Sequence, residues 1–265
     1  MSGEERARDE RFDERDHRAQ SGEERASAIS VDKVDTGYGR VQILHEVSLT
    51  ARTGEVTCIF GPNGCGKSTL LKAMVGAIDP WRGTISIDDQ DITHLPSHKT
   101  LGRGIAMMPQ GGGVFPQLSV RDNLRVGGYT MRSREQLDGR IEELLDEFPR
   151  LRERLRVQAG QLSGGEQMIL SIARALVLNP RFLLFDEPSA GLSPKLVGDV
   201  LVRAAGLAER GVGVIMIEQN IREALRVADR LYVLVAGRNR FDGTPADVED
   251  DRELMHLYLG VTREE

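Results

Sequence analysis

Apolar and polar positions alternate along the chain in a way that predicts an α/β protein. Four short apolar runs have the length of buried strands, and they lie at residues 56–60, 105–108, 182–185 and 212–217. Residues 182–185 are all apolar, which is typical of a strand covered on both faces in a parallel sheet. Apolar residues recur at helical spacing within 119–157, so helices are expected between the second and third runs.

A second group of strand signals lies near the start and the end of the chain. The first part of this group is found at residues 29–31, 41–44, 47–49 and 83–88. A turn carrying Gly37-Tyr38-Gly39 separates the earliest two. Residues 231–235 and 238–241 flank Ala236-Gly237, and this arrangement predicts a β-hairpin.

Residues 1–27 differ in composition from the rest of the chain. They contain nine acidic residues and six arginines, and Phe12 is the only large apolar residue between Met1 and Ile29. The hexapeptide Ser-Gly-Glu-Glu-Arg-Ala occurs in them twice. Such a segment buries too little apolar surface to offset its ordering entropy, so we expect a disordered charged tail followed by one folded domain at 28–265. An interaction arm is the alternative.

Composition and charge restrict the class of protein. Hydrophobic residues at 40% and charged residues at 29% are ordinary for a globular chain. The net charge of −6 argues against nucleic acid as a partner, because neutralising the many phosphates of a nucleic-acid backbone needs a basic surface. No apolar run approaches the ~18 residues of a spanning helix, the first residues are charged, and the chain has two cysteines. We therefore expect a cytoplasmic protein without direct membrane insertion.

A glycine-rich loop between a strand and a helix carries the most specific chemistry. Glycines at its turns let successive backbone N–H groups point at an anion, Lys67 adds a positive charge, and the Ser68 hydroxyl can hold Mg²⁺. The loop comprises Gly61, Pro62, Asn63, Gly64, Cys65, Gly66, Lys67, Ser68 and Thr69. Its Gly-x₄-Gly-Lys-Ser pattern is that of a phosphate-binding loop, so the chain is predicted to bind a nucleoside triphosphate.

Two acidic residues follow the apolar run 182–185. In a parallel sheet the ligand lies at the carboxyl ends of the strands, where Asp186 and Glu187 are expected. Asp186 is placed to hold Mg²⁺ directly or through water, and Glu187 to polarise the attacking water. The alternative is a pair of acids that ends a strand at the surface.

A third segment, Leu-Ser-Gly-Gly-Glu-Gln at 162–167, precedes a helical pattern. The segments 61–69, Gln110, 162–167 and 182–188, in this order, resemble the ATP-binding subunit of an ABC transporter over about residues 29–265. The Leu-Ser-Gly-Gly-Glu segment is highly specific to that family. The resemblance implies a P-loop NTPase cassette with a mostly parallel core sheet, an N-terminal antiparallel β subdomain and an inserted helical subdomain at about 112–178.

The resemblance also implies roles for single residues. Tyr38 would stack on adenine, although from its chemistry alone an aromatic between glycines either stacks on a base or packs. Gln110 would contact Mg²⁺ or water and relay to the membrane subunit. Ser163, Gly164 and Gly165 would contact ATP held by an opposing cassette, which implies a head-to-tail dimer with ATP between the two chains.

Two positions depart from the family pattern. Gln219 stands where a histidine usually contacts the γ-phosphate, and it can donate a hydrogen bond but cannot carry a proton. Ser193 stands where an aspartate is usual. The segments Glu-Gln-Asn at 218–220, Ser-Ala-Gly-Leu-Ser-Pro at 189–194 and Leu-Tyr-Leu-Gly at 257–260 resemble the second ATPase of branched-chain amino-acid importers.

The resemblance implies an ATPase that uses ATP and Mg²⁺ at the inner face of the cell membrane, with permease subunits and a second ATPase as partners. Lys67, Glu187 and Gln219 would be its catalytic residues. Three alternatives stay open: an importer of urea or short amides, an ABC ATPase without a transport role, and a regulatory cassette. A lipopolysaccharide-export ATPase would be expected to keep the histidine. The choice between homodimer and heterodimer also stays open.

Overall fold

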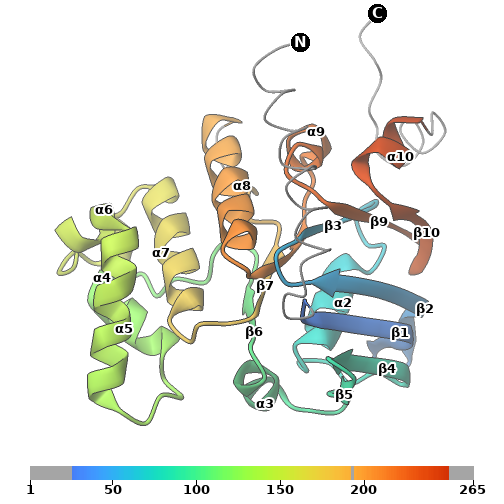
Figure 1. The fold of residues 1–265 in the computed structure, drawn as a ribbon, viewed down its shortest axis with the longest axis horizontal. Helices are drawn as coiled ribbons and strands as arrows, with labels where there is room; N and C mark the ends of the chain where they lie inside the picture. Colours follow the sequence, from blue (N-terminus) through green and yellow to red (C-terminus); the bar gives the residue numbers. More distant parts are fainter. Residues whose placement is uncertain (1–25, 192–193, 251–265) are drawn as a thin grey trace, which may run out of the picture.

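Two β-sheets and a separate group of helices make up the described part of the chain (Figure 1). The computed structural model describes residues 26–191 and 194–250. Residues 1–25 of the tail predicted at 1–27, Ser193 and the ending at 257–260 lie outside the described residues.

The larger sheet has six strands in the order β10-β9-β3-β8-β7-β6, and the five strands from β9 to β6 run parallel. They are β3 (Val56–Phe60), β6 (Ile105–Met108), β7 (Phe182–Asp186), β8 (Gly213–Ile217), β9 (Arg230–Val235) and β10 (Arg238–Gly243). Every residue of β3, β7 and β8 is buried, because helices or the second sheet cover both faces. β10 pairs antiparallel with β9, which confirms the predicted hairpin.

The smaller sheet is antiparallel, with the strand order β2-β1-β4-β5. Its strands are β1 (Ala28–Tyr38), β2 (Val41–Arg52), β4 (Arg82–Ile87) and β5 (Gln90–Asp91). β1 and β2 are longer than the short strands predicted from the sequence. β1 continues through its polar middle, where β-bulges accommodate residues that do not fit the regular register, with Lys33 at a φ of 47°. The buried Thr36 hydroxyl donates a hydrogen bond to the backbone oxygen of Asp79 at 2.8 Å.

Helix α2 (Lys67–Met74) lies between the two sheets. Its buried Leu70, Leu71 and Met74 share one hydrophobic core with β1 and β2 on one side and with the core sheet on the other. Alternate residues of β7 serve the two cores: Leu184 contributes to this one, and Phe185 to the core on the opposite face. The helix that begins at the glycine-rich loop is therefore held from both sides.

The helical lobe is formed by four helices and one short 3₁₀ turn between β6 and β7. These elements are α4 (Val120–Gly127), α5 (Arg134–Glu147), α6 (Pro149–Glu153), η1 (Ala159–Gln161) and α7 (Gly164–Leu176). Serines begin α4 and α5, where the side chains of Ser119 and Ser133 accept hydrogen bonds from first-turn amides. Pro149 begins α6, the position at which a missing N–H costs least. The remaining helices are α3 (Ser97–Gly102), α8 (Pro194–Glu209), α9 (Ile221–Leu225) and α10 (Pro245–Asp250).

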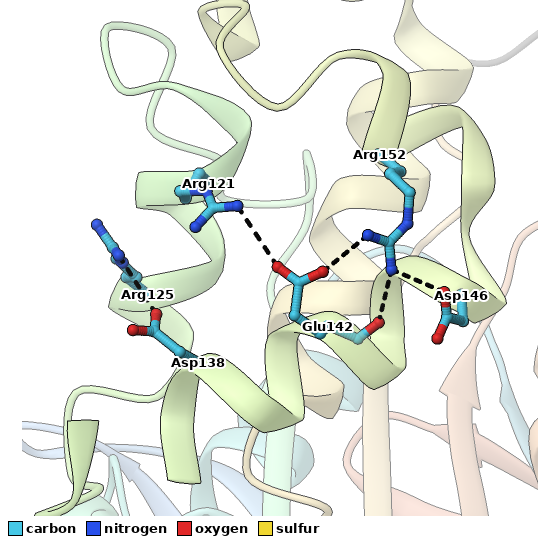
Figure 2. Close-up of polar contacts among 6 residues, drawn as sticks. All are labelled: Arg121, Arg125, Asp138, Glu142, Asp146 and Arg152. Atoms are coloured by element: carbon cyan, nitrogen blue, oxygen red, sulfur yellow. Dashed lines mark hydrogen bonds and ion pairs between the residues drawn. The ribbon is translucent and has the colours of Figure 1, made fainter. Parts of the chain in front are cut away.

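Ion pairs join three helices of this lobe on its surface (Figure 2). Glu142 of α5 binds Arg121 of α4 at 3.4 Å and Arg152 of α6 at 2.7 Å. Arg152 also reaches Asp146 at 2.7 Å and the backbone oxygen of Glu142 at 3.1 Å. Exposed pairs contribute only about 0–1 kcal/mol each, so the network adds a modest connection to the apolar core that packs these helices together.

Candidate functional site

The glycine-rich loop turns sharply between β3 and α2, and its glycines are required by its packing. Gly61 has a φ of 143°, and a Cβ atom there would lie 2.0 Å from the backbone oxygen of Leu234. Gly66 has a φ of 105°, and its Cβ would lie 2.6 Å from Leu44 Cδ2. Gly66 is also the N-cap of α2 and carries no side chain that could accept a hydrogen bond from the first-turn amides. The N-terminus of α2 is therefore open to an anion.

The turn of the β9–β10 hairpin is hydrogen-bonded to the glycine-rich loop. The Gly237 N–H donates to the backbone oxygen of Cys65 at 3.0 Å, and the Gly237 oxygen accepts from the N–H of His45 at 2.8 Å. The Cys65 side chain is buried, and burial raises the pKa of its thiol. A thiol in this state is a poor nucleophile, which fits a small packing residue in the loop.

Lys67 lies across its own loop. Its Nζ atom donates to the backbone oxygens of Gly61 at 2.7 Å and Pro62 at 3.1 Å, and the residue is 6% exposed. An ammonium group has three donors, so one remains beyond these two bonds. This geometry fits a cation that moves from loop carbonyls to a phosphate when one is present.

Ser68 and Asp186 meet at the carboxyl end of β7. The Ser68 hydroxyl donates to Asp186 Oδ1 at 2.9 Å. Burial raises the pKa of Asp186, the Ser68 hydrogen bond opposes that rise, and the Glu187 carboxylate adds to it. A hydroxyl and a carboxylate are oxygen ligands of the kind that Mg²⁺ prefers, so this pair fits the ion.

Glu187 directly follows the strand and has a φ of 52°, which is rare outside glycine. Its Oε2 accepts a hydrogen bond from Gln110 Nε2 at 2.8 Å. Glu187 and Gln219 also line one cavity of about 240 Å³. The structure thus brings together three predicted residues from the ends of β6, β7 and β8. Strained backbone held in place at a cavity is a feature of functional sites.

Tyr38 ends β1 and is 48% exposed, so it belongs to neither core. Its hydroxyl lies 3.5 Å from Lys72 Nζ, and that nitrogen lies 5.9 Å from the centre of the ring. Tyr38 is thus a partly exposed ring beside α2, with the Lys72 ammonium over it.

The segment at the start of α7 has a different place. Ser163 and Glu166 form a capping box, in which the Ser163 N–H donates to Glu166 Oε2 at 2.9 Å and the Ser163 oxygen accepts from the Glu166 N–H at 3.3 Å. Within 26–191 and 194–250, no hydrogen bond joins Ser163, Gly164 or Gly165 to the loop 61–69. Figure 1 places α7 in the helical lobe and α2 beside the antiparallel sheet.

Two features at the site were not anticipated from the sequence. Arg174 of α7 donates to the backbone oxygens of Gly112 and Gly113, and the Ser171 hydroxyl donates to that of Gly112. The stretch after Gln110 is thus tied to α7. The signal was weak, because an arginine and a serine in a helix usually face solvent.

The second unanticipated feature is Glu218, a carboxylate that is 2% exposed at the end of β8. Its Oε1 accepts from the Ser189 N–H at 3.0 Å, and its Oε2 accepts from the Ser189 hydroxyl at 2.6 Å and the Gln219 N–H at 3.1 Å. Burial raises the pKa of Glu218, and the hydrogen bonds from Ser189 oppose the rise. The only sign of this buried carboxylate in the sequence was a glutamate that follows four apolar strand residues.

The described residues contain no cluster of three or more His, Cys, Asp or Glu side chains that could hold a metal ion. Nor does any helix in those ranges have the length and apolar character needed to cross a membrane.

Comparisons with known proteins agree with this geometry. A family described as ABC transporter matches residues 44–190. The high-affinity branched-chain amino acid transport ATP-binding protein BraG of Pseudomonas aeruginosa is 40% identical over 232 residues, which cover 88% of this chain and 99% of that protein. The lipopolysaccharide export system ATP-binding protein LptB of Escherichia coli K12 is 39% identical over 238 residues, with coverage of 88% and 98%. The ADP conformation of MJ1267, an ATP-binding cassette of an ABC transporter, superimposes with a TM-score of 0.79 at 27% identity and covers 89% of this chain and 99% of that chain.

Proposed function

Because the chain belongs to the ABC transporter family as an ATP-hydrolysing cassette, we propose that it powers a membrane importer of branched-chain amino acids. The observation that carries this proposal is the 40% identity to BraG over 99% of that protein. Gln219 in place of the usual histidine, within Glu-Gln-Asn at 218–220, adds support.

Lipopolysaccharide export is the second candidate. It is favoured by the 39% identity to LptB over nearly the same length. An export ATPase is expected to have a histidine where this chain has Gln219, and for that reason we rank import first.

In the proposed site, the loop 61–69 and the first turn of α2 bind the phosphates of ATP. Lys67 exchanges its bonds to loop carbonyls for bonds to the terminal phosphate oxygens. Ser68, Asp186 and Gln110 would hold Mg²⁺, which neutralises charge on the phosphates when it is bound. Tyr38 offers its exposed face to the adenine.

Glu187 is the proposed general base. Its carboxylate accepts a proton from the attacking water, and Gln110 orients it through the 2.8 Å hydrogen bond. Gln219 lines the same cavity and donates its amide N–H groups to the γ-phosphate.

The proposed assembly pairs this chain with a second cassette. The signature segment, Leu-Ser-Gly-Gly-Glu-Gln at 162–167, begins α7 in the helical lobe (Figure 1), and in the described part of the chain no hydrogen bond joins Ser163, Gly164 or Gly165 to the loop 61–69. Each chain would then bind ATP through its loop 61–69 and complete the other site with its signature segment. Membrane permease subunits would dock on the helical lobe, which would place the chain at the inner face of the membrane.

Transport measurements test the proposal. The full chain is assembled in proteoliposomes with candidate permeases and a solute-binding protein, and ATP-driven uptake of labelled leucine, valine, urea and acetamide is compared. We expect uptake of leucine and valine above the two amides, and loss of both nucleotide binding and uptake in Lys67→Ala. Uptake of urea alone, or ATPase activity stimulated by a lipopolysaccharide-export membrane partner, would assign another transporter.

A further inference from the structure

A buried carboxylate joins the two segments that follow β7 and β8. Glu218 is the residue directly before Gln219, and Ser189 comes two residues after Glu187. Three hydrogen bonds of 3.0, 2.6 and 3.1 Å run from the Ser189 N–H, the Ser189 hydroxyl and the Gln219 N–H to the carboxylate oxygens of Glu218. All four residues line the same cavity of about 240 Å³.

We propose that Glu218 is a positioning residue for ATP hydrolysis, because its carboxylate fixes the segment after Glu187 against the segment that carries Gln219. This inference rests on the proposed roles of Glu187 and Gln219. It adds to them a residue that is 2% exposed and that would act through Ser189 and through the backbone of Gln219 and Asn220.

The hydrogen bonds require a group that accepts on both oxygens. Oε1 serves one backbone N–H, and Oε2 serves a hydroxyl and a second backbone N–H. In Glu218→Gln one of these oxygens becomes an NH₂ donor of nearly the same size. Whichever way the amide turns, it faces one of the two backbone N–H groups, which then loses its acceptor. The substitution therefore removes at least one of the three hydrogen bonds and weakens the link between the two segments, while the volume of the side chain stays nearly the same.

Ser189 is the second half of the contact. Its side chain is buried, and Ser189→Ala removes the 2.6 Å bond while the backbone N–H bond to Oε1 is kept. A misplacement of catalytic groups by a fraction of an ångström slows the chemical step more than it weakens substrate binding. The proposal thus predicts an effect on kcat and little effect on the KM for ATP.

The rival explanation is that Glu218 only stabilises the turn after β8. A matched control separates the two. The buried Thr93 hydroxyl accepts the Ile85 N–H at 2.9 Å in the antiparallel sheet, so Thr93→Val also removes the acceptor of a backbone N–H. It is expected to lower the melting temperature while kcat stays within about twofold of wild type.

The experiment measures steady-state ATP hydrolysis and thermal melting for the full-length wild type, Ser189→Ala, Glu218→Gln, the double variant and Thr93→Val. Each single variant at the cavity is expected to lower kcat by about tenfold with KM within about twofold, and the double variant to be no slower than Glu218→Gln. Unchanged kcat in Ser189→Ala, losses that multiply in the double variant, or a matching loss of kcat in Thr93→Val would overturn the proposal. If Glu218→Gln does not fold, Ser189→Ala decides by the same split between kcat and KM. A wild type that does not hydrolyse ATP would instead refute the proposed function.

Discussion

Replacing Glu187 by glutamine tests the proposed general base most directly. The change exchanges one carboxylate oxygen for an NH₂ group and keeps the shape of the side chain. The amide oxygen of the variant can still accept the 2.8 Å hydrogen bond from Gln110 Nε2, so the geometry of the site is expected to survive. What is lost is the ability to accept a proton from water.

The expected magnitude follows from that single loss. General base catalysis contributes about 10²–10⁴ in rate, which corresponds to about 2.7–5.4 kcal/mol of transition-state stabilisation. Nucleotide affinity should change by less than about twofold, because Lys67 and the first turn of α2 are untouched.

Two measurements on the purified full chain check this expectation. Hydrolysis is followed by phosphate release at saturating Mg-ATP, and affinity by titration calorimetry in the same buffer. Glu143→Gln, the same chemical change at a 66% exposed position of α5, serves as the control and should behave as wild type. Hydrolysis by Glu187→Gln within about twofold of wild type would refute the assignment of the base.

Two further predictions concern the loop 61–69 and the start of α7. Gly66→Ala should weaken Mg-ATP binding and lower the melting temperature, because the new Cβ would lie 2.6 Å from Leu44 at a φ of 105°. The control Gly206→Ala adds a Cβ in open space within α8 and should raise stability by about 0.5–1 kcal/mol. Calorimetry and thermal melting compare the two variants, and equal effects would contradict the packing argument. The Ser163 N–H and hydroxyl lower the pKa of Glu166 below its usual 4.5, so its contribution is present above about pH 4.5 and is lost as pH falls through the lower folded value. Glu166→Ala should therefore cost about 0.5–1 kcal/mol in urea unfolding at pH 7 and less at pH 4, and a gap that stays constant with pH would count against the capping box.

The parallel core could be predicted because its strands leave a simple pattern. β7 and β8 are covered on both faces, so their sequences are apolar without alternation and stand out in any window. The loop 61–69 was equally clear, since its glycines are demanded by contacts such as that of Gly61 with Leu234. Both features could be recognised because their sequence patterns are local, although the contact that requires Gly61 comes from the distant β9.

The rest depends on contacts between segments that are distant in sequence. The middle of β1 gave no strand signal because its residues are polar. The strand forms there with β-bulges in its register and with a hydrogen bond from Thr36 to Asp79, and neither can be seen in the local sequence. The partner of Glu218 is 29 residues away, and no local pattern relates it to Ser189. The roles proposed for Ser163, Gly164 and Gly165 involve a second chain, and they stay predictions.

The attachment of the helical lobe has an evolutionary consequence. The polypeptide leaves the core sheet at the end of β6 and returns at the start of β7, and these strands are neighbours with Ile105 beside Phe182 and Met108 beside Phe185. The lobe is thus an insertion between adjacent strands. Lengthening such an insertion raises the entropic cost of loop closure by only about 0.6 kcal/mol for each doubling of its length. Related proteins can therefore acquire differently shaped lobes, suited to different docking partners, on an unaltered catalytic sheet.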